Sequence, residues 1–150
     1  MIISFDLDDT LIPGTKKFDV EKQNTFQKIF GIEKLRKGTI ELIIKLKLKG
    51  HKIYIYTTSF RTPRKIWWTF FSYGIRVDRV INQKKHLKFL PKDRLASKYP
   101  PAFNIDIHID DSYGVEIEGN NNNFRTIIVN NDNTNWCYYI LQSIEKYSKI

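Results

Sequence analysis

Short apolar runs alternate along the chain with stretches in which apolar residues recur at the spacing of a helix. The runs are rich in Ile, Val, Tyr and Phe, which favour β-strands, and they occupy residues 1–7, 52–57, 78–82, 105–109 and 125–129. Because helical patterns lie between them, right-handed crossovers between parallel strands are expected. The pattern therefore predicts an α/β fold, a Rossmann-like three-layer sandwich around a mostly parallel sheet of about five strands.

Two helices are expected between the first and second of these strands. The first would be capped by Asp19 and end at Gly31. Its apolar face would consist of Val20, Phe26, Ile29 and Phe30. The second covers residues 39–49, where lysines and leucines also alternate as in a strand. The spacing of Glu41 and Lys45 by four residues favours the helix.

Two further helices follow the second and fifth strands. Thr62 and Pro63 form a strong helix start, a capping residue followed by proline, and Gly74 would end that helix. The last helix carries a stripe at helical spacing, which is expected to cover the core: Trp136, Tyr139, Ile140, Ile144 and Tyr147. The polar stretch 119–123 predicts a surface turn before the fifth strand.

Composition is that of one globular domain spanning residues 1–150. The chain is 41% hydrophobic and 14% aromatic, and it has a length that supports a sizeable core. The start of the chain does not resemble a signal peptide, and no run approaches the roughly 20 apolar residues of a transmembrane helix. The single cysteine, Cys137, excludes an intramolecular disulfide. A soluble cytoplasmic protein with no membrane partner is expected.

The formal net charge of +9 leaves two interpretations open. Basic residues are spread along the chain, with small clusters at 16–17, 61–65 and 84–86. Such a surface can simply be solvated, as the abundance of Ile, Lys and Asn also suggests a general compositional bias. Alternatively, the charge attracts phosphate-bearing substrates or a nucleic acid.

The segment after the first apolar run carries the most informative chemistry. Asp6 and Asp8 lie two residues apart, followed by Thr10. Unpaired carboxylates beside a core are costly, so a strand that delivers both acids into a site is the economical explanation. A calcium loop starting at Asp6 does not fit, because Leu11 and Lys17 stand where such a loop needs glycine and glutamate.

Three further groups of polar residues lie near the ends of other predicted strands. Thr57, Thr58 and Ser59 come after the second strand, Lys98 lies shortly before the fourth, and the pair 110–111 of aspartates ends the fourth. A carboxylate can attack phosphorus, and a second can donate a proton to the leaving group. A hydroxyl, a lysine and a magnesium ion can stabilise the transferring group.

The order and spacing of these four motifs, over residues 1 to about 130, resemble the haloacid dehalogenase (HAD) superfamily of aspartate-dependent phosphotransferases. The resemblance implies that Asp6 is the nucleophile and Asp8 the general acid/base. It further implies that Asp111, with Asp110 alongside, binds Mg²⁺ together with Asp6 and the backbone carbonyl of Asp8. Asp9 stands where many members have glycine.

The same resemblance implies a phosphate-binding role for Thr57, with Thr58 beside it. Lys98 would be the lysine of the third motif, and the Pro100-Pro101 turn after it limits how far the chain wanders before the next strand. Lys84 and Lys85 follow the third strand and remain alternatives. Arg61 begins the helix after Thr57 and is a candidate for contacting further anionic groups. The three histidines lack metal-ligand spacing, and His108 is expected to be a core or sheet-face residue.

Neither the gap before Thr57 nor the gap between Thr57 and Asp110 has room for a folded cap domain. A capless site, open to solvent, is therefore expected. The favoured function is a magnesium-dependent phosphomonoesterase acting on a nucleotide, a phosphosugar or a phosphorylated macromolecule. The alternative is a non-catalytic binding protein on the same fold that docks a nucleic acid through its basic surface.

Overall fold

The computed structural model describes residues 1–148. The strands are β1 (Ile2–Phe5), β2 (Lys52–Tyr56), β3 (Arg79–Ile81), β4 (Ile107–Asp110) and β5 (Arg125–Ile128). The helices are α1 (Thr25–Ile29), α2 (Thr39–Leu48), α3 (Pro63–Ser72), α4 (Gln83–Phe89), α5 (Tyr113–Asn122) and α6 (Trp136–Ser148). A single 3₁₀ turn, η1 (Pro100–Phe103), precedes β4.

The five strands form one parallel sheet in the order β3-β2-β1-β4-β5. At its centre, Phe5 of β1 pairs with Ile55 of β2 and Ile109 of β4. The central strands are buried on both faces. One face is apolar, and the other carries Ser4 and His108, which are hydrogen-bonded to each other. The predicted α/β fold and its parallel sheet are confirmed.

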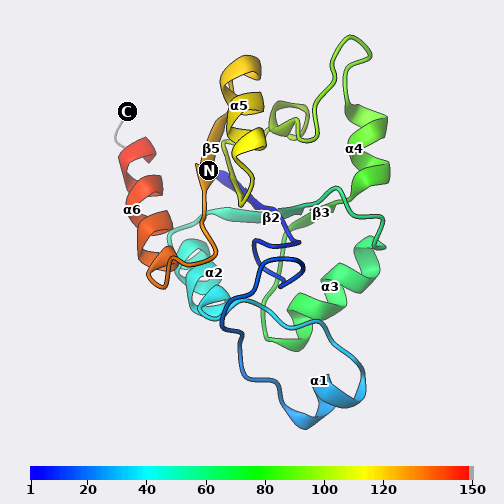
Figure 1. Cartoon of the computed structure of the whole chain (residues 1–150), viewed down its shortest axis with the longest axis vertical. Helices are drawn as coiled ribbons and strands as arrows, with labels where there is room; N and C mark the ends of the chain where they lie inside the picture. The colour runs from blue at the N-terminus through cyan, green and yellow to red at the C-terminus, as the bar shows by residue number, and fades with distance from the viewer. Residues whose placement is uncertain (149–150) are drawn as a thin grey trace.

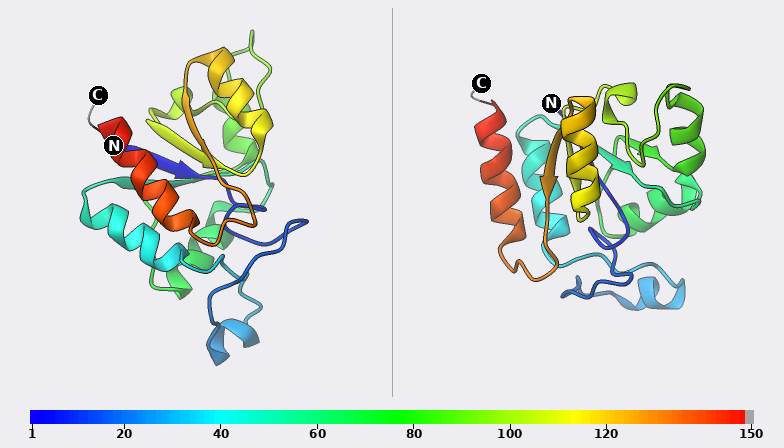
Figure 2. Two further views of the ribbon diagram at one scale, coloured as in Figure 1. Left: turned by 60° about the vertical axis from the view of Figure 1, so that its left-hand side comes forward. Right: turned by 45° about the horizontal axis from the view of Figure 1, so that its top comes forward.

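Helices cover both faces of this sheet and complete the three layers. Figures 1 and 2 show α4 and α5 on one side and α2 and α3 on the other, with α6 packed beside α2. The core between these layers is built mainly from aliphatic residues of the central strands and of α2 and α6: Ile3, Phe5, Leu42, Ile43, Leu46, Ile53, Ile55, Ile107, Ile109 and Ile140. Since the helices exclude water from both faces, the strand ends are where polar side chains reach solvent.

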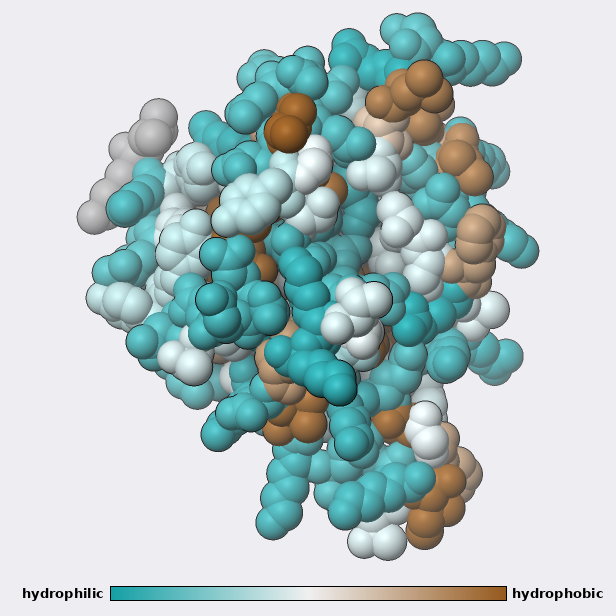
Figure 3. Space-filling view, in the orientation of Figure 1, coloured by the Kyte–Doolittle hydropathy of each residue, from teal (hydrophilic) through white to brown (hydrophobic). Residues whose placement is uncertain are grey.

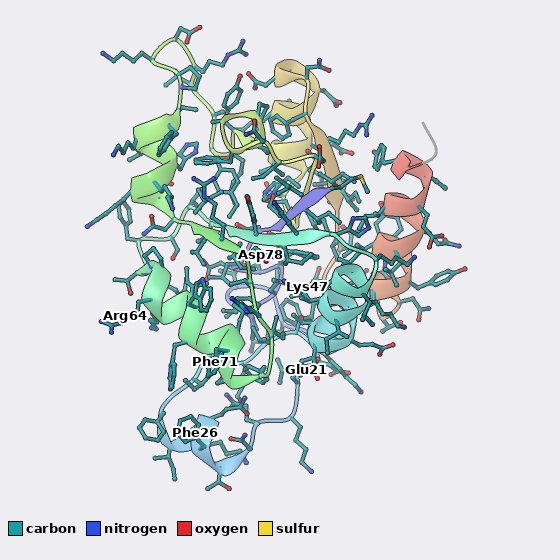
Figure 4. All side chains as sticks on the ribbon, turned by 180° about the vertical axis from the view of Figure 1, so that it is seen from behind. Glu21, Phe26, Lys47, Arg64, Phe71 and Asp78 are labelled. Carbon is teal, nitrogen blue, oxygen red and sulfur yellow. The ribbon has the colours of Figure 1, made fainter. Side chains whose placement is uncertain are left out.

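Local capping explains where two of the helices begin. Thr62 Oγ1 accepts a hydrogen bond from the backbone N–H of Lys65, and Pro63 occupies the first turn of α3, as predicted. Helix α2 instead follows Gly38, whose φ of 92° is in the left-handed region. Glu21 caps it from a distant loop by accepting the N–H of Gly38 at 2.9 Å (Figure 4).

One side chain also joins the edge strand to the helical layer. The carboxylate of Asp78, just before β3, accepts the backbone N–H of Ile53 and the ammonium of Lys47, both at 2.8 Å (Figure 4). These two bonds hold the pKa of Asp78 below its ordinary value, although its partial burial alone would raise it. The contact fixes α2 against the start of β2.

The prediction of a helix from Asp19 to Gly31 is wrong in its extent. Helix α1 covers only Thr25–Ile29, and Asn24 caps it in a capping box with Gln27. Val20 instead forms an antiparallel bridge with Arg36. Phe26, Ile29 and Phe30 of the expected apolar face are exposed, whereas Val20 is half-buried. The residue of α1 that packs inward is Gln27, whose side chain donates to the carbonyl of Ser72.

Two helices were not predicted, and one turn was predicted wrongly. Helix α4 follows β3, capped by Asn82, and α5 follows β4. Residues 119–122 belong to the last turns of α5 rather than to a surface turn. The helix ends only at Asn123, which adopts a left-handed φ of 55°. Asparagine-rich sequence has weak helix propensity, so contacts with β5 decide this segment.

The stripe of the last helix behaves as predicted over most of its length. Trp136, Ile140 and Ile144 are buried against the core, whereas Tyr139 is exposed. The Trp136 indole N–H donates to the carbonyl of Lys37, which joins the start of α6 to the loop before α2. No helix within residues 1–148 combines the length and apolar character needed to cross a lipid bilayer.

Candidate active site

Three aspartates lie close together at the point of the sheet where the strand order reverses. The chain builds β2 and β3 on one side of β1 and then crosses to build β4 and β5 on the other, which makes the gap between β1 and β4 a topological switch point. The N–H of Asp6 donates to the carbonyl of Ile109 at 2.8 Å and so extends the pairing to the strand end. One oxygen from each of Asp6, Asp110 and Asp111 lies within 4.8 Å of the others.

Lys98 places its ammonium between two of these acids. Its Nζ forms an ion pair with Asp6 Oδ1, lies 3.4 Å from Asp110 Oδ2, and donates to the carbonyl of Tyr56 at 3.1 Å. The three charged residues are almost fully buried, with exposed fractions of 3% for Lys98, 6% for Asp6 and 2% for Asp110. Charges this deep require partners, and these residues supply them for one another.

The loop that carries Lys98 is held from two sides. The carboxylate of Glu118, on α5, accepts the N–H of Ser97 at 2.8 Å, the hydroxyl of Ser97 at 2.9 Å and the N–H of Lys98 at 3.1 Å. On the other side, the Tyr56 hydroxyl accepts the N–H of Tyr99 at 2.8 Å. These bonds fix the backbone on both sides of Lys98, so the ammonium reaches Asp6 from a constrained position.

Burial acts in opposite directions on the pKa values of Asp6 and Lys98, although both values end above their ordinary ones. Burial raises the pKa of Asp6 to about 7, even though the charge of Lys98 lowers it, and the nearby charge of Asp110 raises it further. Burial alone would lower the pKa of Lys98, but the charges of Asp6 and Asp110 raise it above its ordinary value. The ammonium therefore stays charged, while Asp6 is poised to exchange a proton near neutrality.

Asp110 is the acid that remains ionised. Burial alone would raise its pKa, but a hydrogen bond from His108 and the charge of Lys98 bring it below the ordinary value. His108 Nε2 lies 3.0 Å from Asp110 Oδ2, and its Nδ1 lies 2.7 Å from the hydroxyl of Ser4. Full burial lowers the pKa of His108, so the ring is neutral at pH 7 and can donate one N–H to Asp110. His108 is thus the core residue that was expected, with the added task of orienting Asp110.

Asp111 lies closer to solvent than the other two acids. Its Oδ2 is 2.6 Å from Lys16 Nζ, which also donates to the Asp111 carbonyl at 3.1 Å, and its Oδ1 accepts from Thr10 at 3.2 Å. Lys16 belongs to the loop after β1, so residues about 95 positions apart meet here. The loop therefore forms one wall of the site.

Asp8 is engaged by an arginine rather than by the acid cluster. Arg61 donates to the Asp8 carboxylate at 2.8 Å and to Glu33 at 2.9 Å, and these two charges raise the pKa of Arg61 although its partial burial lowers it. The Asp8 side chain is 39% exposed. Its carboxylate thus stands at the solvent side of the site.

Asp9 has a backbone conformation that explains why glycine suits this position. Its φ is 63°, in the left-handed region, where a side chain is strained. The Asp9 carboxylate offsets this strain by accepting the N–H of Gly14 at 2.9 Å, the hydroxyl of Thr15 at 2.7 Å and the N–H of Lys16 at 2.7 Å. Asp9 therefore shapes the loop that brings Lys16 to the acid cluster.

The predicted phosphate-binding residues follow β2, next to β1. Thr57 is buried, and its N–H donates to the carbonyl of Ile81 at 2.9 Å. Its hydroxyl accepts the N–H of Ser59, and the hydroxyl of Ser59 accepts the N–H of Arg61, both at 3.1 Å. Thr58 is exposed between them. The turn thus leads directly from the strand end to Arg61.

The two alternative lysines lie away from the acids. Lys84 is exposed on α4, and the Lys85 ammonium lies 3.5 Å from the carbonyl of Val80. Neither contacts Asp6, whereas Lys98 does. Of the three candidate lysines, the geometry favours Lys98.

The acid cluster fits a hard divalent cation such as Mg²⁺. Its donors are carboxylate oxygens from three side chains, Asp6, Asp110 and Asp111, which is the ligand chemistry that Mg²⁺ prefers. The three carboxylates face the two ammonium groups of Lys98 and Lys16, which leaves one negative charge when all are ionised. The carboxylate of Asp8 is not among these donors.

Sequence reasoning did not identify several residues that shape this site. Glu118 lies on an unpredicted helix, and Glu33 and Lys16 come from the long segment between β1 and α2, so no local pattern marked them. His108 had a usable signal: it stands two residues before Asp110 on the same strand, so both side chains point to one face.

Comparison with known proteins adds no identification. No family model matches the chain, and no curated protein is significantly similar to it. Functional assignment consequently depends on the geometry of the site.

Proposed function

We propose that the protein is a magnesium-dependent phosphomonoester hydrolase of the HAD type, acting through an aspartyl phosphate on Asp6. The observation that carries the proposal is the buried arrangement of Asp6, Lys98 and Asp110 at the switch point of a parallel sheet. A buried ion pair is weak evidence for stability, because apolar residues would stabilise the fold as well. The desolvation cost of burying these charges has an explanation if a carboxylate and an ammonium must both contact a charged substrate.

The proposed reaction has two steps. A carboxylate oxygen of Asp6 attacks phosphorus, the bond to the leaving oxygen breaks, and that oxygen takes a proton from Asp8. Water then attacks phosphorus of the acyl phosphate and gives a proton to Asp8, which releases inorganic phosphate and restores Asp6. Bound by Asp6, Asp110 and Asp111, Mg²⁺ would neutralise charge on the phosphoryl oxygens.

Three further groups complete the proposed roles. Lys98 balances the charge of the transferring group from inside the protein, and the hydroxyl and loop amides at Thr57 bind its oxygens. Arg61 has a second task, because its ion pair with Asp8 fixes the position of that side chain before substrate arrives.

The direct test is turnover of p-nitrophenyl phosphate by the full chain with and without Mg²⁺. Asp6→Asn should lower turnover by about 1,000-fold or more, since the nucleophile is lost. Asp8→Asn should cost less with this substrate than with an alkyl phosphate, because a good leaving group needs little protonation. Absent turnover, together with salt-sensitive nucleic-acid binding in a gel shift, would instead support a non-catalytic binding protein. Turnover that does not depend on Mg²⁺ would contradict the proposed role of the metal.

A further inference from the structure

The outer face of α3 is apolar where a surface helix is normally polar. Arg64, Trp67, Trp68 and Phe71 recur at the spacing of one helical face, while Ile66 and Phe70 on the opposite face are buried in the core. Trp67, Trp68 and Phe71 are 38%, 49% and 59% exposed. A hollow of about 650 Å³ runs along this face, lined by the four stripe residues with Thr62 and Lys65.

Helix α1 extends the same surface. The Phe26 ring lies 6.4 Å from that of Trp68 and 4.4 Å from that of Phe30, and Trp68 stacks on Phe71 at 5.9 Å. Figure 4 shows Arg64, Phe71 and Phe26 along the side of the molecule that α3 and α1 form, and Figure 3 shows apolar side chains gathered over α1 at the lower edge. We call this surface, made of Phe26, Phe30, Arg64, Trp67, Trp68 and Phe71, the aromatic face.

Helix α3, which carries most of the aromatic face, begins close to the proposed active site. Helix α3 begins two residues after Arg61, which contacts Asp8, and the neighbouring Phe60 is 68% exposed. From Arg61 to Trp68 the chain advances seven residues, about 10 Å along a helix. The rings of α3 therefore lie within about two helical turns of Arg61.

Charge decides which kind of partner suits this surface. Arg64 and Lys65 flank the rings, Lys28 lies on α1, and the chain as a whole carries a net charge of +9. A second copy of the chain would bring like charges together, whereas an anionic partner gains from them. Flat, exposed rings beside cationic side chains are the features that bind single strands, whose bases stack and whose phosphates pair with the cations.

We propose that the aromatic face binds the terminal nucleotides of a single-stranded nucleic acid whose phosphorylated end enters the site at Asp6. The inference rests on the proposed function, since it names the substrate class of the same site. The step is the one already described: the terminal phosphoester is cleaved, the strand leaves with a free hydroxyl, and water supplies the oxygen that completes inorganic phosphate.

The test compares two substrates and three proteins. Short single-stranded oligonucleotides with a 3′- or 5′-phosphate are offered beside p-nitrophenyl phosphate, with wild type, Trp68→Ala and the matched control Tyr138→Ala. Tyr138 is also an exposed aromatic residue, and it lies on α6, far along the chain from the aromatic face. Trp68→Ala should lower kcat/KM for the oligonucleotide by about tenfold, mainly through KM, and leave p-nitrophenyl phosphate turnover unchanged. Tyr138→Ala should change neither.

Other outcomes overturn the inference in distinguishable ways. Equal loss on both substrates, or no loss on the oligonucleotide, would show that the face does not bind the strand. Normal p-nitrophenyl phosphate turnover without oligonucleotide turnover would reject the strand and keep the phosphatase, whereas loss of both would reject the phosphatase itself. Binding of anionic phosphatidylserine vesicles that Trp68→Ala abolishes, without oligonucleotide binding, would assign the face to a membrane surface instead. Binding of a phosphate-free oligonucleotide that weakens with salt would support the inference.

Discussion

Replacing Lys98 by methionine removes a buried charge and keeps most of the length of the side chain. In the wild type the Lys98 ammonium compensates Asp6 and Asp110, and all three side chains are almost fully buried. Breaking a buried pair by removing one partner costs about 3–5 kcal/mol, because the remaining charge is left uncompensated. For a domain of this size we expect the melting temperature to fall by about 6–20 °C at pH 7.5.

The loss should shrink at low pH. Burial already raises the pKa of Asp6 to about 7 in the wild type, and without Lys98 the pKa must rise further. A raised carboxyl pKa means that the folded protein binds a proton more tightly than the unfolded chain, so the variant is most stable below the unfolded pKa. Its stability then falls as the pH rises towards the folded pKa. At pH 5 the melting temperatures of Lys98→Met and wild type should therefore lie closer together than at pH 7.5.

Activity should fall more than stability alone explains. A single lost donor to the transferring group costs about 10²–10³ in kcat in comparable sites. We would measure kcat for p-nitrophenyl phosphate with saturating Mg²⁺, well below each melting temperature, and confirm folding by circular dichroism. Lys84→Met, on the exposed face of α4, is the matched control and should behave as wild type. Near-normal kcat for Lys98→Met would refute the reasoning, and collapse of the Lys84 variant would identify a different lysine.

Three further predictions concern the remaining groups of the site. The affinity for Mg²⁺ should weaken as the pH falls below about 7, because a proton on Asp6 competes with the metal, and it should level off above pH 7. Calorimetry at several pH values measures this affinity, and an affinity independent of pH would contradict the prediction. Glu118→Ala should lower kcat about tenfold with little change in KM, because it frees the loop that positions Lys98, whereas Glu118→Gln should keep most of the activity; equal loss in both variants would argue against positioning. In urea unfolding, Asp9→Gly should be about 1 kcal/mol more stable than Asp9→Ala, since only glycine relieves the φ of 63°, and the reverse order would show that the conformation is unstrained.

The strands and the helix α3 could be predicted because their signals are local. Short runs rich in Ile, Val and Tyr favour strands through their own side chains. Thr62 and Pro63 start a helix through contacts within one turn. The same holds for the acids at the strand ends. Parallel strands present their carboxyl ends at one edge, and Asp6 and Asp110 meet there because β1 and β4 are neighbours in the sheet.

The extent of α1 and the existence of α4 and α5 could not be predicted from local sequence. A helix at α5 needs β5 beside it to offset its weak asparagine-rich sequence, and α1 is short because only Gln27 finds a site to pack. The exposure of Phe26 could not be predicted either, since a pattern of apolar residues does not show whether another part of the protein covers them. The sequence pattern indicated an apolar face, and the tertiary structure left it open to solvent.

The charge partners of the site divide in the same way. The sequence by itself indicated which acids stand at strand ends, and it left Lys98, Lys84 and Lys85 as candidate partners for them. Only the tertiary structure decided that Lys98 reaches Asp6, that Arg61 holds Asp8, and that Glu118 fixes the intervening loop. Residues one or two turns apart interact through fixed helix and strand geometry, whereas these partners lie between 20 and 92 positions apart and meet only along the path that the folded chain takes.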